Sequence, residues 1–177
     1  MNAPLPSPLL TDRGRQALYA LAAGLRAPRT LRTRSRDEAL QWMQRLHGPA
    51  ALSPPDLDST PHHCPDPAAL LAIWDQMAAA VGPRQPLVLQ AWLPGTQYTV
   101  CVLPGPEDVL MRSWFGDGRP LPARGMLHRA LALHANRARN VLHAADRPLR
   151  CRFARDADGH MHLLWAKPLH LPEGVTP

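Results

Sequence analysis

The order in which the periodic segments follow one another constrains the fold of this chain more than any single motif does. In the first half, helical periodicity alternates with short strand patterns. There a capping box, Ser35-Arg36-Asp37-Glu38, begins a helix that Gly48 ends. Strand patterns dominate the second half, around one long helical segment at 126–145. This order predicts an α+β fold of two lobes rather than alternating βαβ units.

The same patterns predict the individual elements. Asp66-Pro67 begins a helix that ends at Gly82, while 54–65 is expected to form a loop. The predicted strands include a meander over 86–93, 96–103 and 109–114, and a hairpin of 149–155 with 160–166. Further segments are a helix over 11–25 capped by Thr11 or Asp12, an edge strand at 28–33 and a short strand at 49–53. The predicted organisation is a Pro-rich lead at 1–10, a helix-rich lobe at 11–85 and an antiparallel-sheet lobe at 86–172.

Composition excludes several classes of protein. With 177 residues, 45% of them hydrophobic, the chain suffices for one domain or two small lobes with a shared core. Its apolar runs are too short to span a bilayer, and residues 1–10 lack the pattern of a signal peptide, so we expect a cytoplasmic protein. Three widely spaced cysteines do not form a disulfide framework.

The net charge of +6 comes from nineteen arginines and one lysine, Lys167. An Arg bias of this kind usually reflects a GC-rich coding sequence. The arginines are spread along the chain, and nine aromatic residues offer few stacking platforms for bases. Nucleic acid is therefore not the expected partner.

Five segments follow the motif order of a known family. They are TDRGRQALYALAAGLRAPRT, SRDEAL, HGPAALSPP, LVLQAWLPGTQYTV and CRFARDADGHMHLLWAKPL. In this order the chain resembles the ATP-grasp domain of carboxylate–amine and carboxylate–thiol ligases, over roughly residues 11 to 170. The resemblance implies two lobes that hold ATP between their sheets. It also implies a Lys and two Mg²⁺ ions on the triphosphate, and a substrate carboxylate that becomes an acyl phosphate.

The residues that hold metal and phosphate in the family are replaced in this chain. The resemblance places Trp165 at the metal-ligand Glu and Lys167 at the metal-ligand Asn, while Ser53 stands at a phosphate-binding Lys. Gln97 replaces a Glu, and Arg13 stands where a further Lys is usual. The Gly-rich loop is replaced by DLDSTPHHCPD, which contains no glycine. Because Mg²⁺ requires hard oxygen ligands, phosphoryl transfer by the usual route is not expected.

We therefore expect a degenerate, non-catalytic ATP-grasp module that binds a nucleotide-like ligand or docks on a partner enzyme. The resemblance implies that hinge residues Gln90, Ala91 and Leu93 contact adenine through backbone groups. It adds Gln97, Arg112 and Lys167 as further nucleotide contacts, Lys167 through an ammonium that meets a phosphate. ATP is the candidate cofactor, Mg²⁺ is not expected, a protein partner is expected, and no catalytic or metal-binding residue is assigned. Arg112 fits a surface position on an alternating strand equally well.

Two alternative functions remain open. One is an active ATP-dependent carboxylate–amine ligase whose metal is held by Asp156, Asp158 or the acids of the 56–66 loop. The other is a small scaffold with no nucleotide site.

Other residue clusters have simpler interpretations. His62-His63-Cys64 favours a solvated loop over a metal site, because no second pair of ligands matches it. Cysteines on strand patterns are expected to be buried, and His134 to make a buried hydrogen bond. Simple alternation places His160 and His162 on the opposite sheet face from Trp165.

Overall fold

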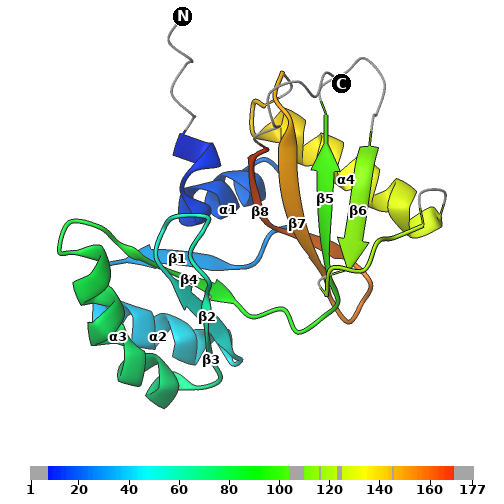
Figure 1. Ribbon diagram of the computed structural model, residues 1–177. Coiled ribbons are helices and arrows are strands. Elements are labelled where there is room, and N and C mark those ends of the chain that lie inside the picture. The colour runs from blue at the N-terminus through cyan, green and yellow to red at the C-terminus, as the bar shows by residue number, and fades with distance from the viewer. Residues whose placement is uncertain (1–7, 104–109, 116, 123–124, 145, 170–177) are drawn as a thin grey trace, which may run out of the picture. The chain divides into compact units, whose positions relative to one another are not determined.

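The computed structural model describes residues 8–103, 110–115, 117–122, 125–144 and 146–169 (Figure 1). The chain forms two compact units. The first comprises residues 1–18 and 28–93, and the second comprises residues 19–27 and 94–177. The predicted α+β architecture with antiparallel sheets is confirmed.

The first unit contains a four-stranded antiparallel sheet in the order β1-β4-β2-β3. The 3₁₀ turn η1 precedes helix α1, which begins in this unit and ends in the second. The elements are η1 (Pro8–Leu10), α1 (Arg13–Ala22), β1 (Thr30–Thr33), α2 (Arg36–Leu46), β2 (Ala50–Ser53), β3 (His62–Cys64), α3 (Pro67–Val81) and β4 (Leu87–Ala91).

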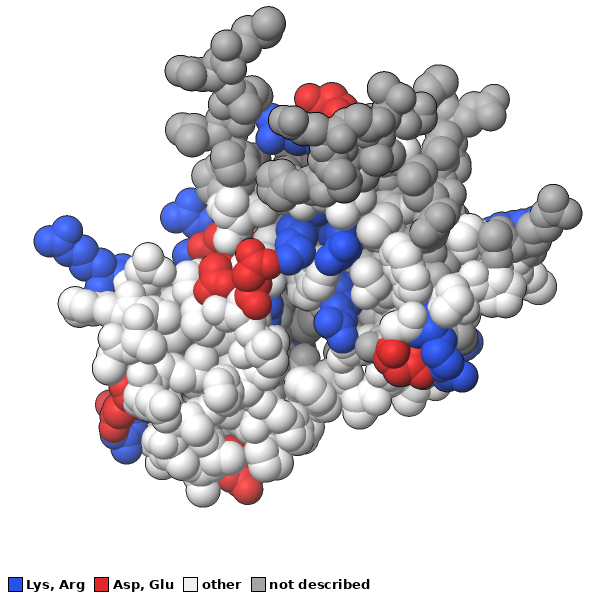
Figure 2. Space-filling model, in the orientation of Figure 1, with Lys and Arg blue, Asp and Glu red and all other residues white. Residues whose placement is uncertain are grey.

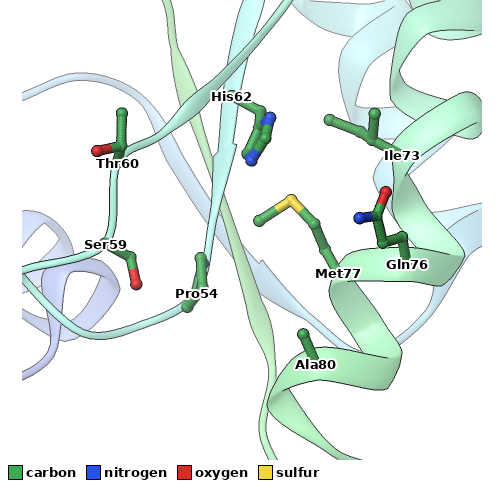
Figure 3. A pocket seen from close by; sticks show the side chains of 8 residues that line it. All are labelled: Pro54, Ser59, Thr60, His62, Ile73, Gln76, Met77 and Ala80. Atoms are coloured by element: carbon green, nitrogen blue, oxygen red, sulfur yellow. The ribbon is translucent and has the colours of Figure 1, made fainter.

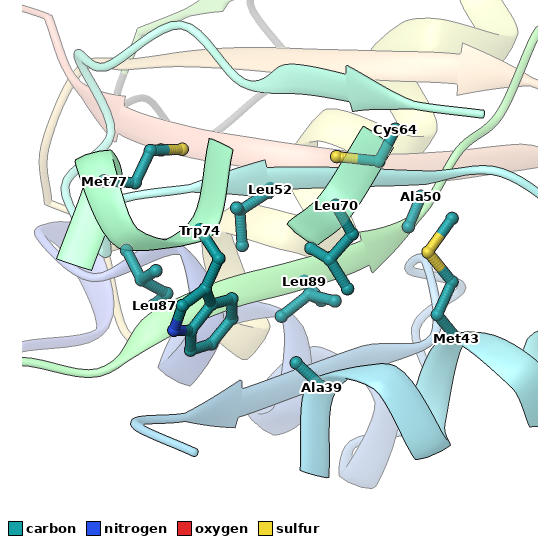
Figure 4. Packing of buried hydrophobic residues seen from close by; sticks show 10 residues of the cluster. All are labelled: Ala39, Met43, Ala50, Leu52, Cys64, Leu70, Trp74, Met77, Leu87 and Leu89. Atoms are coloured by element: carbon teal, nitrogen blue, oxygen red, sulfur yellow. The ribbon is translucent and has the colours of Figure 1, made fainter. Parts of the chain in front are cut away.

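Helices α2 and α3 pack on one face of this sheet and enclose its hydrophobic core (Figure 4). Leu70 and Trp74 of α3 lie against Leu87 and Leu89 of β4. Complete burial of each such leucine stabilises the fold by roughly 1.5–3 kcal/mol. The ten core residues are Ala39, Met43, Ala50, Leu52, Cys64, Leu70, Trp74, Met77, Leu87 and Leu89.

The helix starts follow the predicted capping chemistry, with one difference. Asp66 accepts a hydrogen bond from the backbone N–H of Ala69, with Pro67 in the first turn of α3. Ser35 likewise accepts from the N–H of Glu38. The Glu38 carboxylate does not return the bond to Ser35, because it accepts from the Thr33 hydroxyl instead. Only half of the capping box is therefore formed.

Two expectations for the first unit are wrong. Residues 62–64 form strand β3 on the edge of the sheet, rather than part of a solvated loop, because their backbone pairs with β2. Strand β4 is not part of a meander with the strands that follow it. It pairs with β1 and β2 in the first unit, where its apolar residues complete the core.

The second unit contains an antiparallel sheet in the order β6-β5-β7-β8, with α4 on one face (Figure 1). Phe153 of β7 lies on that face, with its ring 6.2 Å from the imidazole of His134 on α4. His134 is half-buried and has no hydrogen-bond partner among the described residues, so the expected buried hydrogen bond is absent there. The elements are β5 (Gln97–Val102), β6 (Leu110–Phe115), α4 (Met126–Val141), β7 (Leu149–Arg155) and β8 (Met161–Pro168).

A β-bulge divides strand β8 into two halves. Arg152 pairs with Trp165, but the next residue, Phe153, pairs with Leu163, so Leu164 is an extra residue on β8. Beyond the bulge, His162 pairs with Ala154. Because 152 and 154 share a face of β7, His162 and Trp165 lie on the same face of the sheet. The expectation that they lie on opposite faces is wrong, since simple alternation takes no account of the inserted residue.

No helix within the described residues combines the length and the apolar character needed to cross a bilayer.

The turn between the two units' sheets depends on Gly95. A Cβ atom on Gly95 would lie 1.4 Å from the carbonyl oxygen of Arg155, which is backbone and cannot rotate away. We predict that Gly95→Ala destabilises the protein by about 3 kcal/mol, the cost of forced overpacking. Urea unfolding measures this loss. The control is Gly48→Ala, since nothing lies within 4 Å of a Cβ there. Equal unfolding midpoints for the two variants would contradict the prediction.

Candidate functional site

The face of the second sheet opposite α4 carries a group of cationic residues. Leu149, Cys151 and Phe153 of β7 are buried on the α4 side, so the alternating Arg150 and Arg152 lie on the other side. We call this side the basic face, and Figure 2 shows Lys and Arg side chains gathered over the strands of this sheet. The register assigns to it Gln97, Thr99, Cys101, Arg112, Trp114, Arg150, Arg152, Trp165 and Lys167.

One row across the basic face places like charges beside each other. Arg150 pairs directly with Lys167 on β8, and through Cys101 the register places Arg112 of β6 in the same row. Directly opposed like charges destabilise an antiparallel pair. An anion bound over this row would reduce the repulsion between the two cations. Two of the sequence-predicted residues, Arg112 and Lys167, are brought into one row, while Gln97 lies on the same face near its other end.

The neighbouring row combines a guanidinium with an aromatic ring. Arg152 pairs with Trp165, and the Nε atom of Arg152 is buried without a hydrogen-bond partner in the described part of the chain. The Lys167 ammonium lies 5.5 Å from the centre of the Trp165 ring. This contact holds the cation over the ring face, on the basic face. The arrangement presents positive charge above an aromatic surface.

The donors on the basic face do not suit a divalent metal. Within the described strands, the residues that register places on this face include no Asp or Glu. Mg²⁺ prefers carboxylate and phosphate oxygens, whereas guanidinium and ammonium groups repel a cation. Guanidinium groups instead match the geometry of phosphate oxygens. The donors of this face therefore suit an anion better than a divalent cation.

Arg150 and Arg152 were not among the residues predicted from the motifs. The resemblance concerns the positions of the family's ligands, and neither arginine stands at such a position. A signal was present in the alternation of Leu149, Cys151 and Phe153 with the two arginines, which is typical of a strand with one apolar and one basic face.

The predicted hinge residues lie in and after strand β4 of the first unit. The backbone N–H of Ala91 donates to the carbonyl of Arg29, and the N–H of Trp92 donates to the carbonyl of Pro49. Gln90 is 6% exposed, and its side-chain amide donates to the Thr30 hydroxyl. These hinge donors are thus already used within the first unit. The role of Leu93 stays a prediction.

Arg13 has a structural role in the loop over residues 54–60. Its side chain is 2% exposed and donates to the carbonyl of Ser59 at 2.9 Å, while its backbone N–H donates to the carbonyl of Pro55. Asp56 accepts from the Ser59 N–H and hydroxyl. The 54–60 loop is therefore fixed by side chains, so its conformation does not need glycine. Ser53, just before the loop, is 1% exposed.

A cavity of about 370 Å³ lies between this loop and α3 (Figure 3). Ile73, Met77 and Ala80 of α3 form its apolar wall, and the His62 imidazole points toward them from β3. The cavity borders α3, which packs on the helix-covered side of the first sheet. It is therefore separate from the sheet face opposite the helices, where Gln90 lies.

The turn that joins β7 to β8 carries two carboxylates. Oxygens of Asp156 and Asp158 and a ring nitrogen of His160 lie within 4.8 Å of one another. His162 donates from Nε2 to Asp156 at 2.7 Å, and this hydrogen bond is the main cause that lowers the pKa of Asp156 to about 2. Asp156 and Asp158 are among the residues that the sequence suggested for unorthodox metal ligation, whereas His160 is not.

The cysteines fit the predicted role of small buried hydrophobic residues. Cys64, Cys101 and Cys151 are all buried and reduced. Burial raises the pKa of Cys64, and it raises the pKa of Cys151 to about 12. A thiol with a raised pKa holds little thiolate at neutral pH, so neither is suited to nucleophilic catalysis.

We predict that His162→Ala raises the pKa of Asp156 toward its ordinary value of 3.8, because the strongest hydrogen bond to the carboxylate is lost. A carboxyl pKa that folding lowers stabilises the fold above the unfolded value, and this stabilisation is lost as pH falls through about 2. NMR titration of the Asp156 carboxyl carbon measures both proteins. His160→Ala is the matched control, since its Nδ1 lies 3.6 Å from the same carboxylate oxygen. Titration of wild-type Asp156 near pH 4 would refute the assignment.

No protein-family model and no curated protein sequence matches this chain. Solved structures do match. The ATP-grasp ligase PsnB, complexed with a phosphomimetic variant of minimal precursor, Mg and ADP, aligns with a TM-score of 0.72 and 17% identity over 98% of this chain and 53% of that chain. An ATP-grasp RimK domain protein from Sphaerobacter thermophilus DSM 20745 aligns with a TM-score of 0.74 and 16% identity, over 91% and 60% of the two chains.

An L-amino acid ligase from Bacillus licheniformis is similar with a TM-score of 0.71 and 12% identity, over 94% of this chain and 43% of that chain. The chain thus spans about half the length of these proteins. At such low identity the likeness concerns the fold alone. Together with the two α+β units described above, it shows that this chain has the ATP-grasp fold.

Proposed function

We propose that this chain is a non-catalytic ATP-grasp module that binds a nucleotide phosphate chain on its basic face without a divalent metal. The row of Arg150 and Lys167 carries the proposal. Two cations paired directly across neighbouring strands are unfavourable alone and favourable around an anion. A residue pattern that opposes stability in this way is typical of a functional site.

The basic face supplies charge in the place of metal ions. The matched PsnB structure contains Mg and ADP. The resemblance implies that Trp165 and Lys167 of the last strand stand in place of a metal-ligand Glu and a metal-ligand Asn. The positive groups on this face are the Lys167 ammonium and the guanidinium groups of Arg150 and Arg152 on the neighbouring strand. They neutralise phosphate oxygens but do not bridge them as a metal does. Without a metal, several kcal/mol of transition-state stabilisation is lost, which favours binding over phosphoryl transfer.

A protein partner forms a second part of the proposal. The matched ligases extend well beyond the region that aligns with this chain. A partner enzyme would use this module as a nucleotide-binding subunit.

We predict that ADP and ATP bind equally well in EDTA and in Mg²⁺, as measured by isothermal titration calorimetry. Lys167→Glu is expected to weaken ADP binding by about tenfold or more, because a hydrogen bond to a charged group contributes roughly 1.5–3 kcal/mol. Arg150→Glu is expected to act in the same direction. Arg119→Glu is the control, since Arg119 is exposed and paired with Asp117. Binding that requires Mg²⁺ would refute the metal-free site, and no nucleotide binding at all would favour a scaffold.

The alternative function, an active ligase, is supported by the cluster of Asp156, Asp158 and His160. We favour this alternative less, because Asp156 lies six residues beyond Arg150 along the chain. Six residues of extended strand correspond to roughly 20 Å. A metal at that distance does not contact phosphates bound at the Arg150 row. If this alternative holds, Mg²⁺-dependent ATP hydrolysis is expected, with loss of activity in Asp158→Asn. Hydrolysis that Asp158→Asn leaves unchanged would argue against it.

A further inference from the structure

A second cationic region lies in the first unit and shares no residue with the proposed nucleotide site. A cavity of about 600 Å³ is bordered by four arginines, Arg15, Arg32, Arg34 and Arg84. They come from three separate segments: α1, the end of β1 with the turn after it, and the turn between α3 and β4. Three distant parts of the sequence thus bring guanidinium groups to one cavity, which we call the arginine pocket.

The inner part of the arginine pocket is held in place by Asp12. One Asp12 carboxylate oxygen lies 2.7 Å from an Nη atom of Arg32 and 3.7 Å from the Nε atom of Arg15. The same carboxylate caps α1 by accepting from the backbone N–H of Arg15. Asp12 therefore connects the start of α1 to β1 and orients two of the four arginines.

The outer part of the arginine pocket has uncompensated charge. Arg34 and Arg84 are exposed and have no ion-pair partner among the described residues. One carboxylate, Glu38, borders the pocket, and it is engaged by the Thr33 hydroxyl. With Asp12 and Glu38 ionised, the four arginines leave a net charge of about +2. That charge is equal and opposite to the charge of a dianion.

We propose that the arginine pocket binds a phosphate monoester in its dianionic form. Planar guanidinium groups bind phosphate oxygens in bidentate geometry, and several of them converge here on one concave site. RNA is a poorer match, because no aromatic residue borders the pocket to stack a base. The proposal does not depend on the proposed nucleotide function, since the two sites share no residue.

The test measures binding of glycerol 3-phosphate to the full chain by NMR, following the backbone amides of residues 32–38 and 84–85. We expect saturable shifts there, and an affinity about tenfold lower in the double variant Arg34→Gln/Arg84→Gln. Both side chains are exposed, so the variant is expected to fold, which circular dichroism checks. Arg45→Gln is the matched control, because Arg45 is an exposed arginine of the same unit that contacts Gln41 outside the pocket.

Two further arms identify the ligand chemistry. The second proton of a phosphate monoester dissociates near pH 6, so binding is expected to be several-fold weaker at pH 5 than at pH 7.5. A phosphoserine peptide is titrated in parallel. If the peptide binds more tightly than glycerol 3-phosphate, the ligand is a phosphorylated protein. If it binds more weakly, the ligand is a small phosphate monoester. Lys167→Glu is expected to leave this binding unchanged, which separates it from the nucleotide site.

Three results would overturn the proposal. The first is the absence of saturable shifts in the pocket with any of these phosphates. The second is equal affinity in the double variant and in Arg45→Gln. The third is binding of single-stranded RNA at the pocket under conditions where glycerol 3-phosphate does not bind.

Discussion

The register of β7 between β5 and β8 is the constraint on which the second unit depends. Leu149, Cys151 and Phe153 must face the core, so every intervening residue is directed to the opposite side. Those intervening residues are Arg150, Arg152 and the small Ala154. Burial of one face therefore fixes where positive charge gathers on the other, and the hydrophobic core and the anion chemistry have a single cause.

The cations on the second sheet give it a different chemistry from a sheet lined by carboxylates. A carboxylate-lined strand recruits a metal and, through it, phosphate. A strand that bears Lys167 beside Arg150 attracts phosphate directly but offers no Lewis acid. The arginine pocket of the first unit also presents guanidinium groups. It differs from the basic face because a carboxylate, Asp12, orients the guanidinium of Arg32 there. At both proposed sites the cationic side chains outnumber the carboxylates.

Local chemistry made the helices predictable, because Ser35 and Asp66 specify their helix starts through bonds within three residues. The assignment of strands to sheets was less predictable. The segment 86–93 has the same alternation whichever sheet it joins, and only the packing of Leu87 and Leu89 against α2 and α3 decides the matter. Edge strand β3 was missed because its pairing is made by the backbone and its side chains are polar.

The candidate site was predictable only in part. Motif comparison identified Lys167 and Arg112, whereas Arg150 and Arg152 required the register of β7. The arginine pocket was out of reach of the sequence, because its members lie up to 69 positions apart and meet only through tertiary structure.

The bulge at Leu164 sets the phase of the last strand. With the bulge in place, Trp165 and Lys167 lie on the face opposite the core, whereas Ala166 points inward. Because Leu164 is the unpaired residue of the bulge, its deletion would leave a regular ladder in which Arg152 still opposes Trp165 and Phe153 still opposes Leu163. The faces of β8 are therefore specified by its pairing with β7 and not by simple alternation along β8.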